Sequence, residues 1–62
     1  MVNAMAQYRV YVLGPEGRVM GAVQFVCPDD DTAKEYSKQL ADRDFVELWR
    51  DKRRLAKFDP KQ

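Results

Sequence analysis

The first half of the chain alternates apolar and polar positions in a way that predicts two β-strands. Residues 8–13 form a run rich in β-branched and aromatic side chains, and residues 18–27 form a second, longer run. Gly14 to Gly17 separates them with a proline and two glycines, a composition typical of a turn. The two runs together predict a β-hairpin. Gly21, in the middle of the second run, predicts a bulge or a close approach of another backbone.

The pattern then changes to helical spacing, which predicts an α-helix over residues 30–42. Pro28 ends the second strand, and the run Asp29-Asp30-Asp31 supplies carboxylates that cap free amides and favour the positive end of a helix dipole. One narrow, mainly apolar stripe follows, made of Ala33, Tyr36, Ser37 and Leu40. A helix with such a stripe must pack on a sheet.

The last third of the chain predicts a second hairpin. Its strands are residues 45–50 and 53–58, joined by Asp51-Lys52, although neither residue is the glycine that a tight turn prefers. The order β-β-α-β-β predicts an α+β fold with one four-stranded, mainly antiparallel sheet and one helix on one face. Strand order 2-1-3-4 makes every neighbouring pair antiparallel, whereas 2-1-4-3 gives a β-grasp arrangement. We favour the first and keep the second as an alternative.

The patterned region predicts one domain over residues 7–59, with a flexible tail at 1–6 and a short tail at 60–62. Met5 is an alternative start, because the pattern begins only at the end of that first tail. A domain of about 60 residues buries only roughly 60% of the surface of its unfolded chain. We therefore expect additional burial, most simply against a second copy of the chain.

One helix covers one face of the sheet, so the alternation divides the strands into a covered core and an open face. The predicted core is Val10, Val12, Val19, Val23, Phe25, Ala33, Tyr36, Leu40, Val46 and Leu48. The predicted open face is Tyr11, Leu13, Met20, Ala22, Glu47 and Trp49, with Arg9 and Arg50 near it. Tyr, Trp, Met and Arg are enriched at protein interfaces. We therefore predict a homodimer or another protein partner at this face or at a sheet edge, with Tyr11, Met20, Trp49 and Arg50 as interface residues.

The charge of the chain is small overall but unevenly distributed. Residues 1–49 carry five basic and eight acidic side chains, whereas residues 50–62 carry six basic and two acidic ones. Aromatic side chains on a sheet can stack bases while cations hold phosphates, so nucleic-acid binding is the alternative function. Its basic patch would be Arg50, Lys52, Arg53, Arg54 and Lys57. The simpler interpretation is a charged sheet edge protected from unwanted strand pairing.

The residues that usually carry catalysis are scarce. The chain has no histidine, one cysteine and no glycine-rich phosphate loop. Cys27 alone forms neither an intramolecular disulfide nor a structural zinc site, and we interpret it as a small buried hydrophobe. The aspartate run is interpreted as a helix cap, and Glu47 as a cross-strand ion-pair partner of Arg9 or Arg50. We therefore expect a non-enzymatic protein with no catalytic residue, no metal and no cofactor.

The beginning of the chain lacks the pattern of a signal peptide, and no apolar run approaches the roughly 20 residues of a membrane span. These observations predict a cytoplasmic protein that has no membrane partner.

Several short stretches together resemble short uncharacterised bacterial proteins with a domain of unknown function. The stretches are Tyr8-Arg9-Val10-Tyr11, Gly17-Arg18, Ala22 to Phe25 with Cys27, Asp30 with Ala33, and Val46-Glu47-Leu48-Trp49. The resemblance covers most of residues 8–58 and implies the β-β-α-β-β fold and a bacterial cytosolic setting, with no known activity. Lys34 and Tyr36 depart from the small or aliphatic residues expected there. The β-β-α-β order and the helix start Asp31-Thr32 to Glu35 give a weaker similarity to HicB-like antitoxin domains. The alternative function is therefore a nucleic-acid-binding or antitoxin-like regulator that uses the basic C-terminal hairpin.

Overall fold

The two alternating runs of the first half form an antiparallel hairpin. In the computed structural model, which describes residues 4–61, β1 (Ala6–Leu13) pairs with β2 (Val19–Cys27). Val10 lies opposite Val23, so the branched side chains of both strands share one face. A short 3₁₀ turn, η1 (Pro15–Gly17), joins the strands, and Gly17 there adopts a φ of +76°, which a residue without a Cβ adopts readily.

A bulge interrupts the hairpin beside Gly21. Val12 lies opposite Gly21 whereas Leu13 lies opposite Val19, which leaves Met20 as the extra residue of β2. A Cβ added at Gly21 would meet no atom within 4 Å. Of the two predicted reasons for this glycine, the structure therefore shows a neighbouring bulge and no close backbone approach.

The helix begins where the aspartate run predicts it. In α1 (Asp30–Leu40), the Asp29 carboxylate accepts a hydrogen bond of 2.7 Å from the amide of Thr32. The helix ends two residues before the predicted boundary, and the Ala41 amide donates to the carbonyl of Lys38. Ser37 is fully buried in the apolar stripe because its hydroxyl donates to the Ala33 carbonyl at 2.8 Å.

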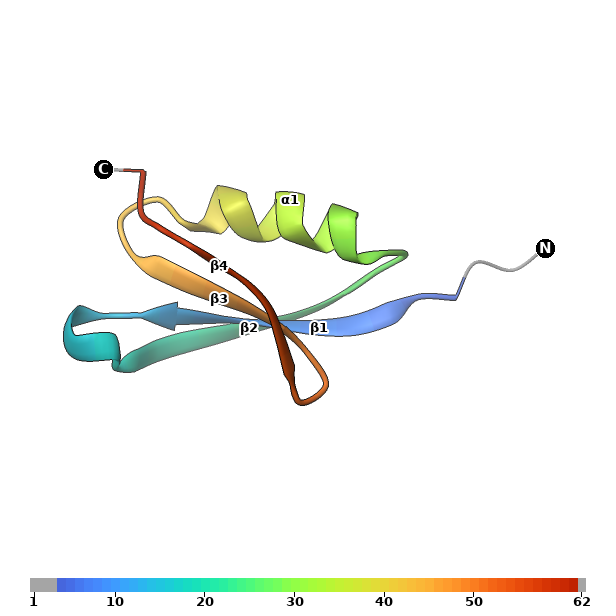
Figure 1. Cartoon of the computed structure of the whole chain (residues 1–62), viewed down its shortest axis with the longest axis horizontal. Helices are drawn as coiled ribbons and strands as arrows, with labels where there is room; N and C mark the ends of the chain where they lie inside the picture. The colour runs from blue at the N-terminus through green and yellow to red at the C-terminus, as the bar shows by residue number, and fades with distance from the viewer. Residues whose placement is uncertain (1–3, 62) are drawn as a thin grey trace.

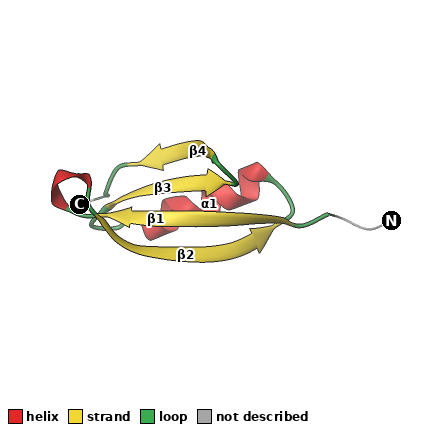
Figure 2. Ribbon diagram, turned by 90° about the horizontal axis from the view of Figure 1, so that it is seen from below, coloured by secondary structure: helices red, strands yellow, loops and turns green. Residues whose placement is uncertain are grey.

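The second hairpin consists of β3 (Phe45–Arg50) and β4 (Arg53–Phe58), with the bounds that the sequence predicts. All neighbouring strands are antiparallel and their order is β2-β1-β3-β4, which confirms the first of the two predicted orders (Figure 2). The helix lies on one side of this sheet (Figure 1). Within residues 4–61, no helix is long and apolar enough to cross a lipid bilayer.

The core lies between α1 and the two inner strands. Its fully buried members are Tyr8, Val10, Ala33, Ala41, Val46 and Leu48, with Cys27 at the margin. Two predicted core residues are wrong: Val19 is 55% exposed and Tyr36 is 40% exposed. The helix packs more closely against β3 than against β2, and the outer side of α1 stays uncovered. Val19 lies opposite Leu13 beyond the bulge and therefore faces the open side. Leu13 keeps its predicted place on the open face, opposite Phe45, and is buried there.

The ends of the predicted domain differ slightly from the observed elements. β1 begins at Ala6, one residue before the predicted domain start. In the predicted C-terminal tail, the Lys61 amide donates to the carbonyls of Ala41 and Asp42, so the chain beyond β4 returns to the end of α1. Residues 1–3 of the predicted N-terminal tail, and Gln62, lie outside the described residues.

Candidate interaction surfaces

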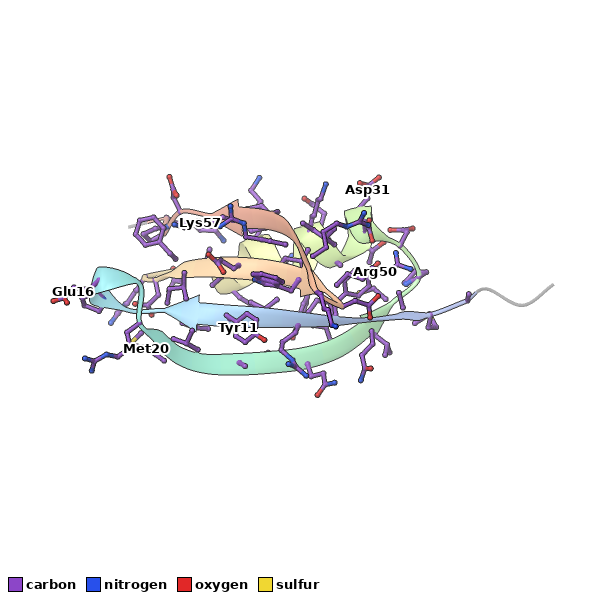
Figure 3. All side chains as sticks on the ribbon, turned by 60° about the horizontal axis from the view of Figure 1, so that its bottom comes forward. Tyr11, Glu16, Met20, Asp31, Arg50 and Lys57 are labelled. Carbon is purple, nitrogen blue, oxygen red and sulfur yellow. The ribbon has the colours of Figure 1, made fainter. Side chains whose placement is uncertain are left out.

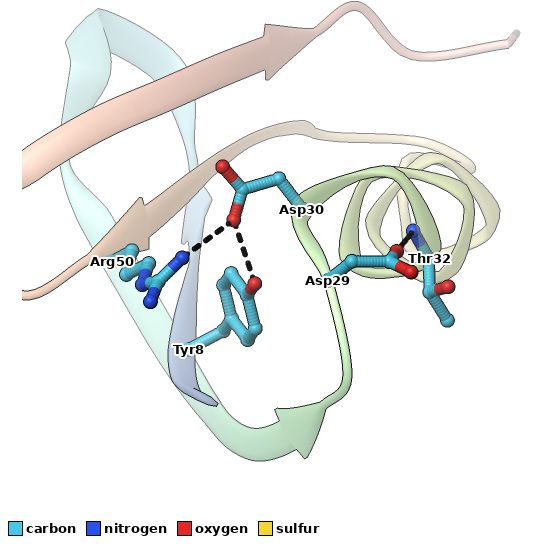
Figure 4. Close-up of polar contacts among 5 residues, drawn as sticks. All are labelled: Tyr8, Asp29, Asp30, Thr32 and Arg50. Carbon is cyan, nitrogen blue, oxygen red and sulfur yellow. Dashed lines mark hydrogen bonds and ion pairs between the residues drawn. The ribbon is translucent and has the colours of Figure 1, made fainter. Parts of the chain in front are cut away.

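A polar cluster fixes the start of α1 to the sheet. The Tyr8 hydroxyl donates a hydrogen bond of 2.7 Å to Asp30 Oδ1, and Arg50 Nη1 lies 3.1 Å from the same oxygen (Figure 4). The Arg50 guanidinium also lies over the Tyr8 ring, 5.8 Å from its centroid. The contacts join β1, α1 and β3, so the cluster holds the helix start over the inner strands.

The same contacts shift two pKa values in opposite directions. Burial, followed by the hydrogen bond to Asp30, raises the pKa of Tyr8 to about 12. The hydrogen bond from Tyr8, followed by the ion pair with Arg50, lowers the pKa of the Asp30 carboxyl below its usual value. A hydroxyl that stays protonated and a carboxyl that stays ionised suit a permanent structural contact rather than proton transfer near neutral pH.

The open face of the sheet centres on an aromatic pair. Tyr11 on β1 and Trp49 on β3 contact edge to face, with ring centroids 6.2 Å apart and planes at 84°. Arg9 Nη1 donates to the Tyr11 hydroxyl at 3.3 Å. The shallow recess beside the pair has a volume of about 120 Å³, below the roughly 300 Å³ of ordinary ligand pockets. The pair therefore forms a surface rather than a binding cavity.

Polar neighbours already engage this aromatic pair. The Trp49 indole N–H donates to Glu47 Oε1 at 3.1 Å, and Arg54 Nη1 lies 3.2 Å from Glu47 Oε2. A cross-strand ion pair of Glu47 therefore occurs, but its partner is Arg54 of β4 and neither of the predicted arginines, Arg9 and Arg50. A sheet face that carries these ion-paired groups is more polar than the alternation alone predicts.

The four predicted interface residues do not form one patch. Tyr11 and Trp49 lie together. Met20 lies at the η1 end of the β1–β2 hairpin, where a Cβ added at Gly14 would come within 2.6 Å of its sulfur (Figure 3). Arg50 points to the helix side, toward Asp30. Sequence reasoning had a signal for this last position, because Arg50 has the strand parity of the buried Val46 and Leu48.

The predicted basic patch is divided between the two faces of the sheet. Arg54 reaches Glu47 on the open face, and on that face Lys57 Nζ lies 5.2 Å from the centroid of the Phe45 ring. Arg50 pairs with Asp30 on the helix side, and Arg53 is near enough for its charge to lower the pKa of that carboxyl. Lys52 is exposed in the turn. These five cations do not share one surface.

The two edges of the sheet differ sharply in charge. The nine residues of β2 carry no charged side chain, whereas β4 carries three in six residues: Arg53, Arg54 and Lys57. Cationic side chains are a common protection of an edge strand against pairing with another chain. Among the described residues, nothing lies beyond β2 in the plane of the sheet (Figure 2). β2 is therefore an open edge without charge protection.

The exposure of β2 follows from its place at this edge. Met20 and Val26 are 54% and 56% exposed, and Val23 and Phe25 are half-buried although they face the helix side. Sequence reasoning named an edge as a possible interface but could not choose between edges, because the choice depends on strand order.

Comparison with known proteins gives no match: no protein-family model, curated protein or solved structure is similar to this chain. The resemblance to short bacterial proteins stays a prediction. Within residues 4–61, no group of three or more His, Cys, Asp or Glu side chains is arranged to hold a metal ion.

Proposed function

We propose that this chain is a small, non-enzymatic interaction module that self-associates through the edge strand β2. One observation carries the proposal: the nine-residue edge of β2 has no charged residue, while the opposite edge has three. An open strand presents a row of free N–H and C=O groups that another strand can pair with. On the open face, Glu47 already contacts Trp49 and Arg54, so this face is more polar than the edge. We therefore favour the edge as the interface.

The setting that we propose is the bacterial cytoplasm. The chain's one cysteine, Cys27, is a free buried thiol, which suits a reducing compartment. A second copy also supplies the additional burial that a domain of this size needs.

Solution mass across protein concentration tests the proposal. We expect a dimer that persists at high salt, because strand pairing between apolar edges does not depend on charge attraction. Met20→Lys with Val26→Lys places two cations on β2 at exposed positions, and we expect a monomer. Phe45→Lys is the matched control, since it charges an exposed apolar position on the inner strand β3 and leaves the dimer intact. A wild-type monomer at every concentration would overturn the proposal.

A second candidate function, binding of single-stranded nucleic acid, is favoured by the open face. There Arg9, Arg54 and Lys57 surround the Tyr11–Trp49 pair. Fluorescence anisotropy of a labelled single-stranded oligonucleotide tests it. Binding at low salt that weakens steeply as salt rises, and is lost in Trp49→Ala, supports this candidate. Unchanged anisotropy at low salt excludes it.

A further inference from the structure

We infer that two copies of the chain pair antiparallel through β2 with a twofold axis at Val23, an inference that rests on the self-association proposed above. An axis perpendicular to the sheet keeps the helix-side residues of both copies on the same face. Each contact then occurs twice, once in each direction between the two copies. The two four-stranded sheets then form one sheet of eight strands. Both α1 helices lie on the same side of it.

The register follows from full overlap of the two edge strands. Val23 is the middle residue of β2, which runs from Val19 to Cys27. Because opposed residues must share a face, the register can move only in steps of two residues along each strand. Centred on Val23, the regular part of the strand gives the pairs Val23 with Val23, Ala22 with Gln24, and Gly21 with Phe25. No charge opposes another in this set.

The pairing of Gly21 with Phe25 uses the open space beside this glycine. A Cβ at Gly21 would lie in open space, with no atom within 4 Å. Phe25 is half-buried and stacks between Tyr8 and Tyr36, at centroid distances of 5.7 and 4.6 Å. Across the twofold axis, the partner's Phe25 ring covers the exposed backbone of Gly21, as aromatic residues do for glycines at sheet edges.

Charges at the ends of β2 select the antiparallel orientation. Arg18 directly precedes the strand in an extended conformation. After the strand and Pro28 come two exposed acids, Asp29 at the helix cap and Asp31 in the first turn of α1. Antiparallel pairing brings the Arg18 end of one copy to the acidic end of the other, and the twofold axis repeats this contact. Parallel pairing would set cation beside cation and acid beside acid, which is unfavourable.

The opposite edge does not offer the same solution. If β4 paired with itself, Arg54 of one copy and Lys57 of the other, which both lie on the open face, would be brought together. Like charges directly opposite one another destabilise a strand pair. Pairing of β2 with β4 would leave a free edge on every copy and would produce an open filament rather than a closed dimer.

Disulfide trapping in a Cys27→Ala chain tests the register, with oxidised glutathione as the oxidant. Residues directly opposite in antiparallel strands have Cα atoms about 4.5–5.5 Å apart, within the range of a disulfide. We expect Val23→Cys to form a covalent dimer by itself. Ala22→Cys and Gln24→Cys form one only when the two chains are mixed. Lys38→Cys, exposed on α1, measures trapping by random collision.

The outcomes separate this inference from the proposed function. The register is overturned, and self-association is not, if the protein is a dimer by mass and one of two results is found. Either Ala22→Cys or Gln24→Cys forms a covalent dimer with itself, or the yield of covalent dimer from Val23→Cys does not exceed that of the Lys38→Cys control. A monomer by mass, with all crosslinks at the control level, overturns both. Loss of crosslinking when Met20→Lys and Val26→Lys are added to Val23→Cys supports both.

Discussion

The two edges of this sheet face the same solvent and have opposite chemistry. β4 is short and carries Arg53, Arg54 and Lys57, whereas β2 is half as long again and carries no charge. Each of the two strands pairs with one of the two inner strands: β2 with β1, and β4 with β3. The difference therefore does not arise from the needs of the core. On the proposal above, the charged edge is protected against pairing and the uncharged edge is available for it.

Removing the charge of the protected edge tests this comparison most strongly. Arg53→Val with Lys57→Val leaves on β4 only Arg54, whose charge is paired with that of Glu47, so the chain has two edges without an unpaired charge. We expect the closed dimer to be replaced by open polymers, because each copy can then pair on both sides. Light scattering measures the growth in mass.

Lys34→Ala with Lys38→Ala is the control for this experiment, because it removes the same charge from the helix surface. That variant should keep the mass of the wild type. If the β4 variant also kept it, the charges of that edge would have no protective role.

The inner strands should respond to substitution far more than either edge. Leu48 on β3 is fully buried, and Leu48→Ala should lower the free energy of unfolding by about 2–5 kcal/mol. Lys57→Ala, at an exposed position of β4, should change it by less than about 0.5 kcal/mol. Urea denaturation followed by circular dichroism measures both. Similar losses for the two variants would contradict the division into a stabilising centre and an adaptable edge.

The anchoring of α1 to β1 and β3 by Tyr8, Asp30 and Arg50 predicts a loss of stability at alkaline pH. The pKa of Tyr8 is about 12 in the folded chain, compared with about 10 for a free tyrosine. A raised pKa contributes stability that is complete below pH 10 and is lost as pH rises toward 12. Tyr8→Phe should remove this decline, whereas Tyr11→Phe on the open face should retain it. The melting temperature as a function of pH measures the effect.

The acid side of the same cluster should behave in the opposite sense. The pKa of the Asp30 carboxyl is lowered, so its contribution is present above the usual pKa of about 3.9 and is lost as pH falls through the lowered value. Asp30→Asn should flatten this acid decline. An unchanged acid profile in that variant would show that Tyr8 and Arg50 do not stabilise the ionised form.

The smallest effect on association is expected from the open face. Trp49→Ala removes the contact with Tyr11 and should lower stability, about 0.5–1.5 kcal/mol of it from the aromatic pair itself. The mass should not change, because Trp49 lies on an inner strand away from β2. A folded Trp49→Ala monomer would move the interface from the edge to the open face.

Most of the fold could be predicted from the alternation of apolar residues. The parity of Val10, Val46 and Leu48 identified the covered face, and the aspartate run located the helix start. Tyr36 was wrong because the pattern says which way a side chain faces but not how far one helix reaches across the sheet. Val19 was wrong because the extra residue Met20 places it opposite Leu13, on the open face. Leu13 keeps the predicted parity, opposite Phe45, but is buried there, which alternation alone does not predict.

The candidate surface was harder to predict. Tyr11 and Trp49 follow from strand parity once β1 and β3 are neighbours. The contact of Tyr8 with Asp30 joins residues 22 positions apart, and no local pattern records it. The unprotected edge becomes visible only when the strand order places β2 on the outside, since the same residues in an inner strand would be ordinary.

The strand order also has a kinetic consequence. Each hairpin joins neighbouring segments of the chain, but the centre of the sheet joins β1 to β3 across the whole of β2 and α1. Contacts between distant segments form late because the intervening loop must first close. Trp49, the only tryptophan, lies on β3 against Tyr11 of β1. Its fluorescence during refolding should therefore report the moment at which two separate hairpins become one sheet.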